Sequence, residues 1–290
     1  MPEQDKFACV HTGDHVDIYQ LSPRLYFRKA SLFDRGQCNS AFIVGEHGVA
    51  VVDPSQVPAI NEMQEEIKAL FDKPLRYVFL THDHGDHALG MPVVLAQPLT
   101  IFCSHRLVDQ YAAQASGAVL VGVRGVTKLT MDGIKIELIS IEDVAHSAND
   151  MLIRLPEERV VCAGDFIVDL PMMYFHDAHP ARWAANLREF QDLPDQYVIP
   201  GHGDLFPFSC FKTTAEYLDT LVKATSKILE NDTPRTLKDI DDAEMNRIVS
   251  SYLDADSPEA RIIKEKAGDQ AQRELRMVLR NMRGRAMSLG

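Results

Sequence analysis

Three histidines and two aspartates occupy six consecutive positions of this chain, within the stretch T-H-D-H-G-D-H from Thr81 to His87. The stretch directly follows the apolar run Arg76–Leu80, which has the length and composition of a buried strand. Because side chains alternate along an extended segment, His82 and His84 point to the same side of it. Imidazole nitrogens and carboxylate oxygens are the ligands that zinc and similar divalent ions prefer. A solvated polar loop is the alternative, but eleven histidines in 290 residues make so dense a cluster unusual by chance. We therefore predict a metal site.

Further metal-capable side chains follow the first two histidines. Asp86 and His87 lie beyond the turn and can face a second point nearby. Three more groups each come after a predicted strand, namely His146, Asp165 and His202. A glycine precedes both Asp165 and His202, and glycine lets the backbone turn sharply where an ion must be reached. A single histidine after a strand is more often structural, but the whole set in this order predicts one site where strand ends open into loops.

The composition describes an ordinary globular protein with an acidic surface. The net charge of −12 argues against nucleic acid as a partner, because phosphate binding needs clustered lysine and arginine. The negative net charge does not exclude a small anionic substrate, since a metal ion can make the local electrostatic potential positive. We find no apolar run long enough for a membrane helix and no secretory pattern at the start. The five scattered cysteines indicate reduced thiols. We expect a cytoplasmic protein that acts on a small-molecule substrate and binds no membrane.

Short strands and helices alternate along the first two thirds of the chain, which favours a layered α/β fold. Strands are predicted at 40–44, 49–53, 76–80, 100–103, 126–130, 134–139, 151–155, 160–163 and 196–199, and helices at 58–71, 88–96, 105–115 and 181–193. The pattern then changes to helices alone, predicted at 213–229, 242–253 and 258–282. We predict a catalytic domain over residues 1–210 and a helical segment over 211–290. The last helix is amphipathic and either packs on the domain or forms a homodimer through the C-terminal helices.

With these residues in this order, the chain resembles the metallo-β-lactamase superfamily. The family pattern H-x-H-x-D-H is met by His82, His84, Asp86 and His87, the next histidine by His146, the bridging acid by Asp165 and the last histidine by His202. Asp53 matches an acid that the family places behind the site as a structural support. The resemblance covers about residues 15–210.

The resemblance implies a four-layer αββα sandwich with two metal ions in a cleft at one edge. By analogy, the first metal is held by His82, His84 and His146, the second by Asp86, His87 and His202, and Asp165 bridges both. Zinc, two ions per chain, is the expected metal, with iron or manganese as alternatives. This ligand set leaves open positions for water, as a catalytic site requires.

The implied reaction is hydrolysis by a hydroxide that bridges two zinc ions. Its targets would be a carboxylic ester, a thioester, a lactone or a related amide. Asp86 is the candidate to move a proton to the leaving atom, and pure metal ligation is the equal alternative for this residue.

Differences from known subfamilies reduce the range of expected substrates only slightly. The zinc β-lactamases most often studied have cysteine in place of Asp165 and lysine in place of Val168, so β-lactams are a poor first guess. Acyl-homoserine lactonases commonly carry tyrosine where Val168 stands, whereas glyoxalase II enzymes keep the same seven ligands. The alternative function is that of a persulfide dioxygenase, with one iron held by His82, His146 and Asp165. The methionines and aromatic residues within Phe166–Trp183 either line an apolar pocket or pack in the core.

Overall fold

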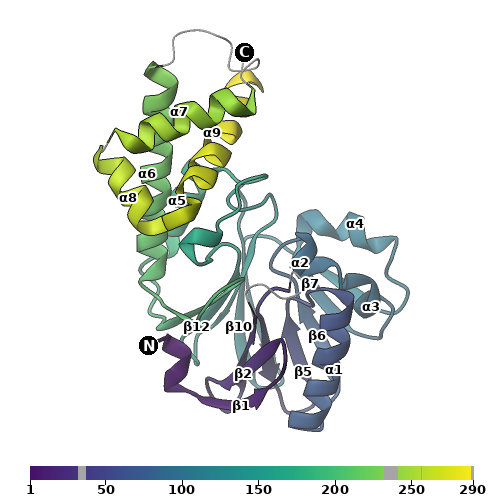
Figure 1. Ribbon diagram of the computed structural model, residues 1–290. Helices are drawn as coiled ribbons and strands as arrows, with labels where there is room; N and C mark the ends of the chain where they lie inside the picture. The colour runs from purple at the N-terminus through teal and green to yellow at the C-terminus, as the bar shows by residue number, and fades with distance from the viewer. Residues whose placement is uncertain (32–36, 232–240, 256, 289–290) are drawn as a thin grey trace. The chain divides into compact units, whose positions relative to one another are not determined.

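The computed structural model describes residues 1–31, 37–231, 241–255 and 257–288, and within them the chain forms two compact units. The first unit comprises residues 1–142, 149–168 and 193–210, and the second comprises 143–148, 169–192 and 211–290. Strands belong to the first unit and most of the long helices to the second (Figure 1). One division between the units falls at residue 210, and the segments 143–148 and 169–192 group with the helices. The predicted division into a catalytic domain over 1–210 and a helical segment over 211–290 stays a prediction.

One sheet of the first unit contains eight strands among the described residues, arranged in chain order. These are β1 (Ala8–Thr12), β2 (Val16–Gln20), β3 (Leu25–Ala30), β4 (Ser40–Val44), β5 (Val49–Val52), β6 (Leu75–Phe79), β7 (Thr100–Ser104) and β8 (Val119–Val123). The first five pair antiparallel, and β5 to β8 pair parallel. Because the carboxyl ends of parallel neighbours meet at one edge, the residues after β5 and β6 lie together there. Asp53 and the histidine-rich stretch are those residues.

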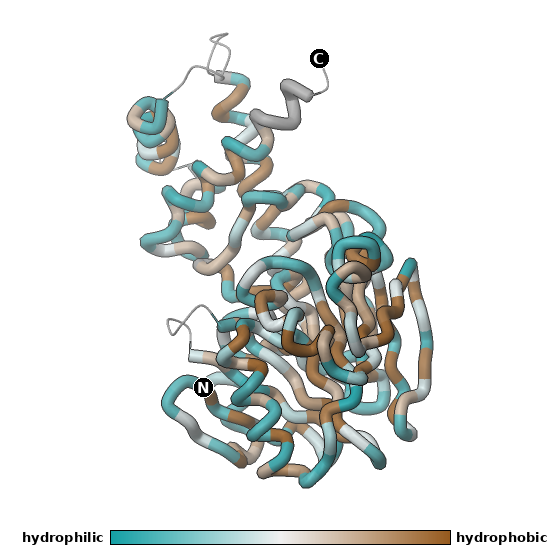
Figure 2. The backbone as a smooth tube through the Cα atoms, turned by 90° about the vertical axis from the view of Figure 1, so that its right-hand side faces the viewer, coloured by the Kyte–Doolittle hydropathy of each residue, from teal (hydrophilic) through white to brown (hydrophobic). Residues whose placement is uncertain are grey.

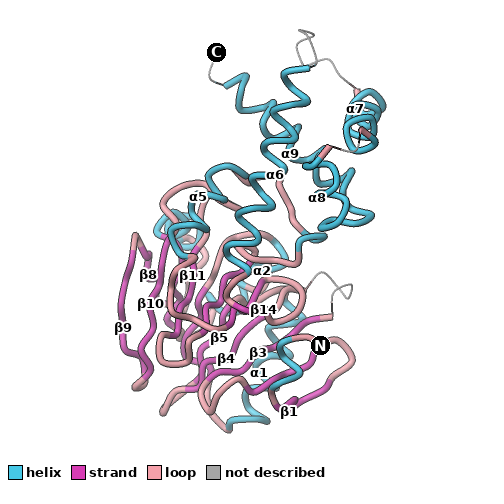
Figure 3. Tube along the Cα trace, turned by 90° about the vertical axis from the view of Figure 1, so that its left-hand side faces the viewer, coloured by secondary structure: helices cyan, strands magenta, loops and turns pink. Residues whose placement is uncertain are grey.

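The second sheet contains six strands among the described residues, in the order β14-β13-β12-β11-β10-β9. These are β9 (Val126–Met131), β10 (Ile134–Ser140), β11 (Met151–Leu155), β12 (Val160–Gly164), β13 (Tyr197–Pro200) and β14 (Phe206–Pro207). Figure 3 labels β9, β10, β11 and β14 of this sheet. Since β12 and β13 pair parallel, their carboxyl ends are neighbours. Asp165 follows the first of these ends and His202 the second, so the pairing brings two predicted ligands to one edge.

Strand β5 shows how side-chain alternation builds two cores. Val49 and Val51 contact a cluster that includes the inner face of a helix, whereas Ala50 and Val52 belong to the cluster between the two sheets. The first unit's helices are α1 (Val57–Phe71), α2 (Gly85–Ala88), α3 (Met91–Leu95) and α4 (Val108–Ala112), with 3-10 turns at Glu3–Lys6 and His105–Leu107. The resulting order of helices, sheet and sheet is that of a layered α/β fold, as predicted.

The second unit is helical. Its helices are α5 (Pro180–Phe190), α6 (Cys210–Asn231), α7 (Asp242–Asp254), α8 (Pro258–Ala267) and α9 (Ala271–Ser288), with 3-10 turns at Leu170–Met172 and Gly268–Gln270. The single helix expected over 258–282 is two helices, because Gly268 takes a φ of 52° and ends the first one. The apolar residues of this stretch are mostly buried, including Ile263, Leu275 and Val278. Packing of the last helix on the catalytic domain stays a prediction. Figure 2 shows hydrophobic and hydrophilic residues alternating along these helices. The homodimer stays a prediction.

The N-terminal strands β1 to β3, and strands β8 and β14, were not among the predicted elements. The helix expected over 88–96 begins later as α3, which has proline in its first turn, where proline is tolerated. None of the described helices has the length and apolar content needed to cross a membrane.

Candidate metal centre

Four predicted ligands of the first unit converge on one point. Asp86, His87, Asp165 and His202 each offer one ligand atom, and these atoms lie within 4.8 Å of one another. His202 Nε2 is 2.8 Å from Asp86 Oδ2, and His87 Nε2 is 3.1 Å from Asp165 Oδ1. They come from α2, from the end of β12 and from the turn after β13, so three distant parts of the chain build this group.

A second group shares one of these residues. His82, His84 and Asp165 also offer ligand atoms within 4.8 Å of one another. The ring centroids of His82 and His84 are 4.6 Å apart, and those of His82 and His87 are 4.2 Å apart. Asp165 therefore belongs to both groups, which is the arrangement that a bridging carboxylate requires.

His146, the remaining predicted ligand, lies in the segment 143–148 between β10 and β11, which belongs to the second unit. It is buried, and its ring centroid is 5.3 Å from that of Trp183 in α5. Its part in a metal site stays a prediction.

Asp53 stands behind the ligands as a hydrogen-bond acceptor. Its Oδ1 accepts from Thr81 N at 2.7 Å, and its Oδ2 lies 2.8 Å from His87 Nδ1. The backbone of Asp53 has a φ of 58°, a conformation that aspartate tolerates better than most residues. Holding Nδ1 of His87 from behind leaves Nε2 facing the other ligands, which fixes how this ring can bind an ion.

The turn that carries His202 is held by Asn39, a residue that sequence reasoning missed. Asn39 Nδ2 donates to Pro200 O at 3.1 Å and to Gly203 O at 3.0 Å, and its backbone N–H donates to Gly201 O at 2.7 Å. These bonds join the start of β4 to the end of β13 and fix the path of the backbone on both sides of His202.

The local charges favour a cation at this point of the metal-free protein. Complete burial alone would lower the pKa of His87, but Cys38, Asp165 and Asp53 outweigh it and raise that pKa well above its usual range. Burial opposes ionisation of Asp86, yet the hydrogen bond with His202 and the charge of His87 lower the pKa of Asp86 below its ordinary value. Positive charge among these carboxylates is therefore stabilised.

The donor set fits a metal by its chemistry. Among the described residues of the two groups, every donor is an imidazole or a carboxylate, and His82, His87 and Asp165 are buried. Such donors suit zinc, and they also suit iron and manganese.

Comparison with known proteins identifies the family. The sequence profile described as the metallo-beta-lactamase superfamily matches residues 33–202. The chain belongs to the metallo-β-lactamase superfamily. It is 22% identical over 230 residues to a beta-lactamase-like protein 2 homolog from Caenorhabditis elegans, an alignment that covers 77% of this chain and 72% of the relative. It is 21% identical over 232 residues to a metallo-beta-lactamase type 2 from Bacteroides fragilis, covering 75% of this chain and 91% of that protein.

A solved structure shows the same fold. The metallo-beta-lactamase from Pontibacter korlensis superimposes with a TM-score of 0.61 at 20% sequence identity, covering 70% of this chain and 99% of that one. At this level of identity the likeness is one of fold, and it confirms the predicted metallo-β-lactamase sandwich. The predicted C-terminal helical extension is present as helices α6 to α9.

The histidine-rich stretch is also held in place by a pair of hydrogen bonds between Asp83 and Asn149. Asn149 Nδ2 donates to Asp83 Oδ1 at 2.8 Å, and Asp83 N donates back to Asn149 Oδ1 at 3.2 Å. This reciprocal pair ties the residue between His82 and His84 to the entry of β11. The sequence could point to Asp83, because this residue lies inside the histidine-rich motif. It could not identify Asn149 as the partner of Asp83, because Asn149 lies 66 positions away.

The methionines and aromatic residues after Asp165 mostly pack as core. Met173, Phe175 and Trp183 are buried, and the ring centroids of Phe175 and Trp183 are 6.0 Å apart within the second unit. Tyr174 and His176 are exposed.

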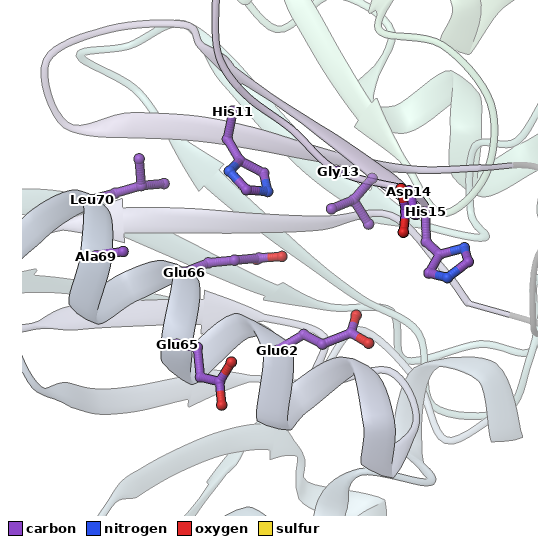
Figure 4. A pocket seen from close by; sticks show the side chains of 10 residues that line it. His11, Gly13, Asp14, His15, Glu62, Glu65, Glu66, Ala69 and Leu70 are labelled. Carbon is purple, nitrogen blue, oxygen red and sulfur yellow. The ribbon is translucent and has the colours of Figure 1, made fainter.

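A separate hollow of about 390 Å³ lies between the β1–β2 hairpin and α1 (Figure 4). Histidine and acidic side chains dominate its lining, including His11, His15, Glu62 and Glu65. Glu66, which lines the hollow, forms an ion pair with the buried Arg28, whose Nε donates to Glu66 Oε2 at 2.7 Å. None of the lining residues belongs to either group of predicted ligands. This hollow is therefore distinct from the metal centre.

Proposed function

We propose that this protein is a dinuclear zinc hydrolase of the metallo-β-lactamase superfamily, which cleaves a carboxylic ester, a thioester, a lactone or a related amide bond. The observation that carries the proposal is the position of Asp165. Its carboxylate belongs to two separate groups of donors at once, and such sharing is the basis of a two-metal site.

In this proposal the seven predicted ligands divide between two ions. His82, His84 and His146 would hold the first ion, Asp86, His87 and His202 the second, and Asp165 both. When bound, the zinc pair lowers the pKa of a bridging water toward neutrality, so that hydroxide is available as the nucleophile, and it polarises the substrate carbonyl. Asp53 orients His87 for this task through its contact with Nδ1.

Asp86 is the residue we propose to deliver a proton to the leaving atom. It is less buried than Asp165, and its Oδ2 lies 2.8 Å from His202 Nε2. Ligation alone is the alternative for Asp86. An Asp86→Asn variant that keeps its metal content but loses turnover would support the proton role.

The substrate is proposed to be a small molecule, and β-lactams are not the first choice. Val168, at the position where well-studied zinc β-lactamases have a carboxylate-binding lysine, is buried and uncharged. The acidic chain argues against nucleic acid. A cytoplasmic location is proposed because all five cysteines are free thiols.

Metal analysis of the purified protein is the first test. About two zinc ions per chain support the hydrolase, whereas one iron with oxygen consumption would instead support the persulfide dioxygenase. A panel of thioesters, lactones, aryl esters and β-lactams then defines the substrate class.

Asp165→Ala and His84→Ala should lose both turnover and bound zinc while leaving the circular dichroism spectrum unchanged. His47→Ala is the matched control, since His47 is exposed on the turn between β4 and β5. Full activity in Asp165→Ala would refute the bridged two-metal centre.

A further inference from the structure

The side chain of Thr81 links the support behind the metal centre to one of its ligands. Thr81 Oγ1 donates to Asp53 Oδ2 at 2.7 Å and lies 3.1 Å from His82 Nδ1. The residue is 1% exposed, and its backbone is held on both sides. Its N–H donates to Asp53 Oδ1 at 2.7 Å, and its carbonyl accepts from Met151 N at 2.7 Å.

The backbone of a neighbouring strand leaves room for this hydroxyl. A Cβ added at Gly164 would lie 2.3 Å from Thr81 Oγ1, and Gly164 has a φ of 51°. Glycine at the end of β12 therefore allows Thr81 to stand between Asp53 and His82.

The hydrogen bonds fix where protons lie. A carboxylate only accepts, so the single hydroxyl hydrogen of Thr81 goes to Asp53. The lone pair of Oγ1 then accepts from His82 Nδ1–H, which leaves His82 Nε2 without a hydrogen and able to bind an ion. The same Asp53 Oδ2 also accepts from His87 Nδ1, at 2.8 Å. One oxygen atom therefore supports a histidine of each donor group, one directly and one through Thr81.

We infer that Thr81 is a positioning residue, whose hydroxyl selects the Nε2-binding form of His82 and joins the supports of the two metal sites at Asp53 Oδ2. This inference rests on the proposed metal centre and assigns to Thr81 a role that its place beside the motif does not reveal. Without the hydroxyl, His82 loses the acceptor that orients its ring, while His87 keeps its direct bond to Asp53.

The test is cobalt binding to the metal-free full-length protein, measured by titration with Co²⁺ alone. Thr81→Val keeps the shape of the side chain and removes the hydroxyl, and Thr81→Ser keeps the hydroxyl. Thr225→Val is the matched control, because Thr225 in α6 is equally buried and its Oγ1 has no hydrogen-bond partner among the described residues. Far-ultraviolet circular dichroism checks that each variant is folded.

We expect Thr81→Val to bind Co²⁺ about tenfold to a hundredfold more weakly than the wild type. In proton NMR of the cobalt form, it should lose the solvent-exchangeable imidazole signal of His82 and keep that of His87. Thr81→Ser should restore affinity and signal, and Thr225→Val should behave as the wild type.

Three results would overturn the inference. If Thr81→Val matches the wild type in affinity and spectrum, the positioning role is wrong and the metal centre stands. If Thr81→Ser is as weak as Thr81→Val, the effect is one of packing. If the wild type binds no Co²⁺, the metal centre itself is wrong, and the role of Thr81 falls with it.

Discussion

Gly201 illustrates how a residue without a side chain can shape a candidate metal site. A Cβ at this position would lie 1.9 Å from Asp165 Oδ1 and 2.9 Å from the backbone nitrogen of Asp165. The carboxylate shared by both donor groups therefore occupies the space that any other amino acid at 201 would need. The sequence showed the glycine beside His202, but its dependence on a carboxylate 36 positions earlier was visible only in the structure.

Gly201→Ala should displace the Asp165 side chain and weaken zinc binding at both groups, because Asp165 belongs to both. We expect at least about a tenfold loss of affinity, as seen when the surroundings of a ligand are changed. Competition with a chromophoric chelator measures it. Gly13→Ala is the control, since its added carbon would lie 3.2 Å from the end of the His11 side chain and at ordinary contact distances, 3.4 and 3.7 Å, from atoms of Val16. Unchanged zinc affinity in Gly201→Ala would contradict the account of Asp165.

At the scale of elements, the candidate donor side chains could be picked out from the sequence, and the residues that hold them in place could not. The motif and the glycine-flanked acid and histidine are local signals, because donor type and spacing are written in neighbouring residues. Asn39, Asn149 and Thr81 act through partners far along the chain, so no local pattern identifies them. Strands β1 to β3 were missed although Val16 and Ile18 alternate with polar residues, because the charged residues around them weakened the strand pattern.

Arg154 of β11 forms two ion pairs whose loss we expect to destabilise the fold. Its Nε donates to Asp195 Oδ2 at 2.7 Å and its Nη1 to Glu137 Oε2 at 2.7 Å, so it joins β10, β11 and the segment before β13. The Asp195 side chain is fully buried. Arg154→Met should cost about 3–5 kcal/mol of unfolding free energy, because it leaves a buried carboxylate without its cation.

Urea unfolding measures this cost. Lys135→Met is the matched control, since Lys135 of β10 pairs with Glu157 in the turn after β11, both side chains are exposed, and the loss of this pair should matter far less. Equal effects of the two substitutions would show that burial does not set the value of the Arg154 pairs.

For the whole molecule, a buried carboxyl group in the helical unit makes stability depend on pH. The helical unit buries Glu274 of α9 against Tyr217 of α6, whose hydroxyl donates to the carboxylate. Burial raises the pKa of Glu274 to about 7, although Tyr217, Arg273 and the backbone of Met173 act in the opposite direction. The folded protein therefore binds a proton that the unfolded chain releases between its ordinary pKa and this value.

Because the pKa of Glu274 is higher in the folded protein than in the unfolded chain, this residue makes the protein less stable as pH rises. Stability contributed by protonated Glu274 is fully present below its ordinary pKa of 4.5 and is lost as pH rises to about 7. Glu274→Gln stays neutral, so relative to the wild type it should gain at most about 3 kcal/mol between pH 4.5 and 8. Urea midpoints of both proteins across this range test it. A constant difference between them would show that Glu274 does not titrate as described.

The bonds from Asn39 to the turn around His202 have a consequence for the order of assembly. The segment 200–203 takes its shape from a residue made some 160 positions earlier, at the opening of β4. A ribosome-bound chain that has already exposed the histidine-rich stretch still lacks His202, the last of the proposed ligands, and the strand that presents it. With the proposed ligand set, such a chain offers only part of the site, so we expect tight ion binding only after translation has passed Gly203 and the second sheet has packed against the first.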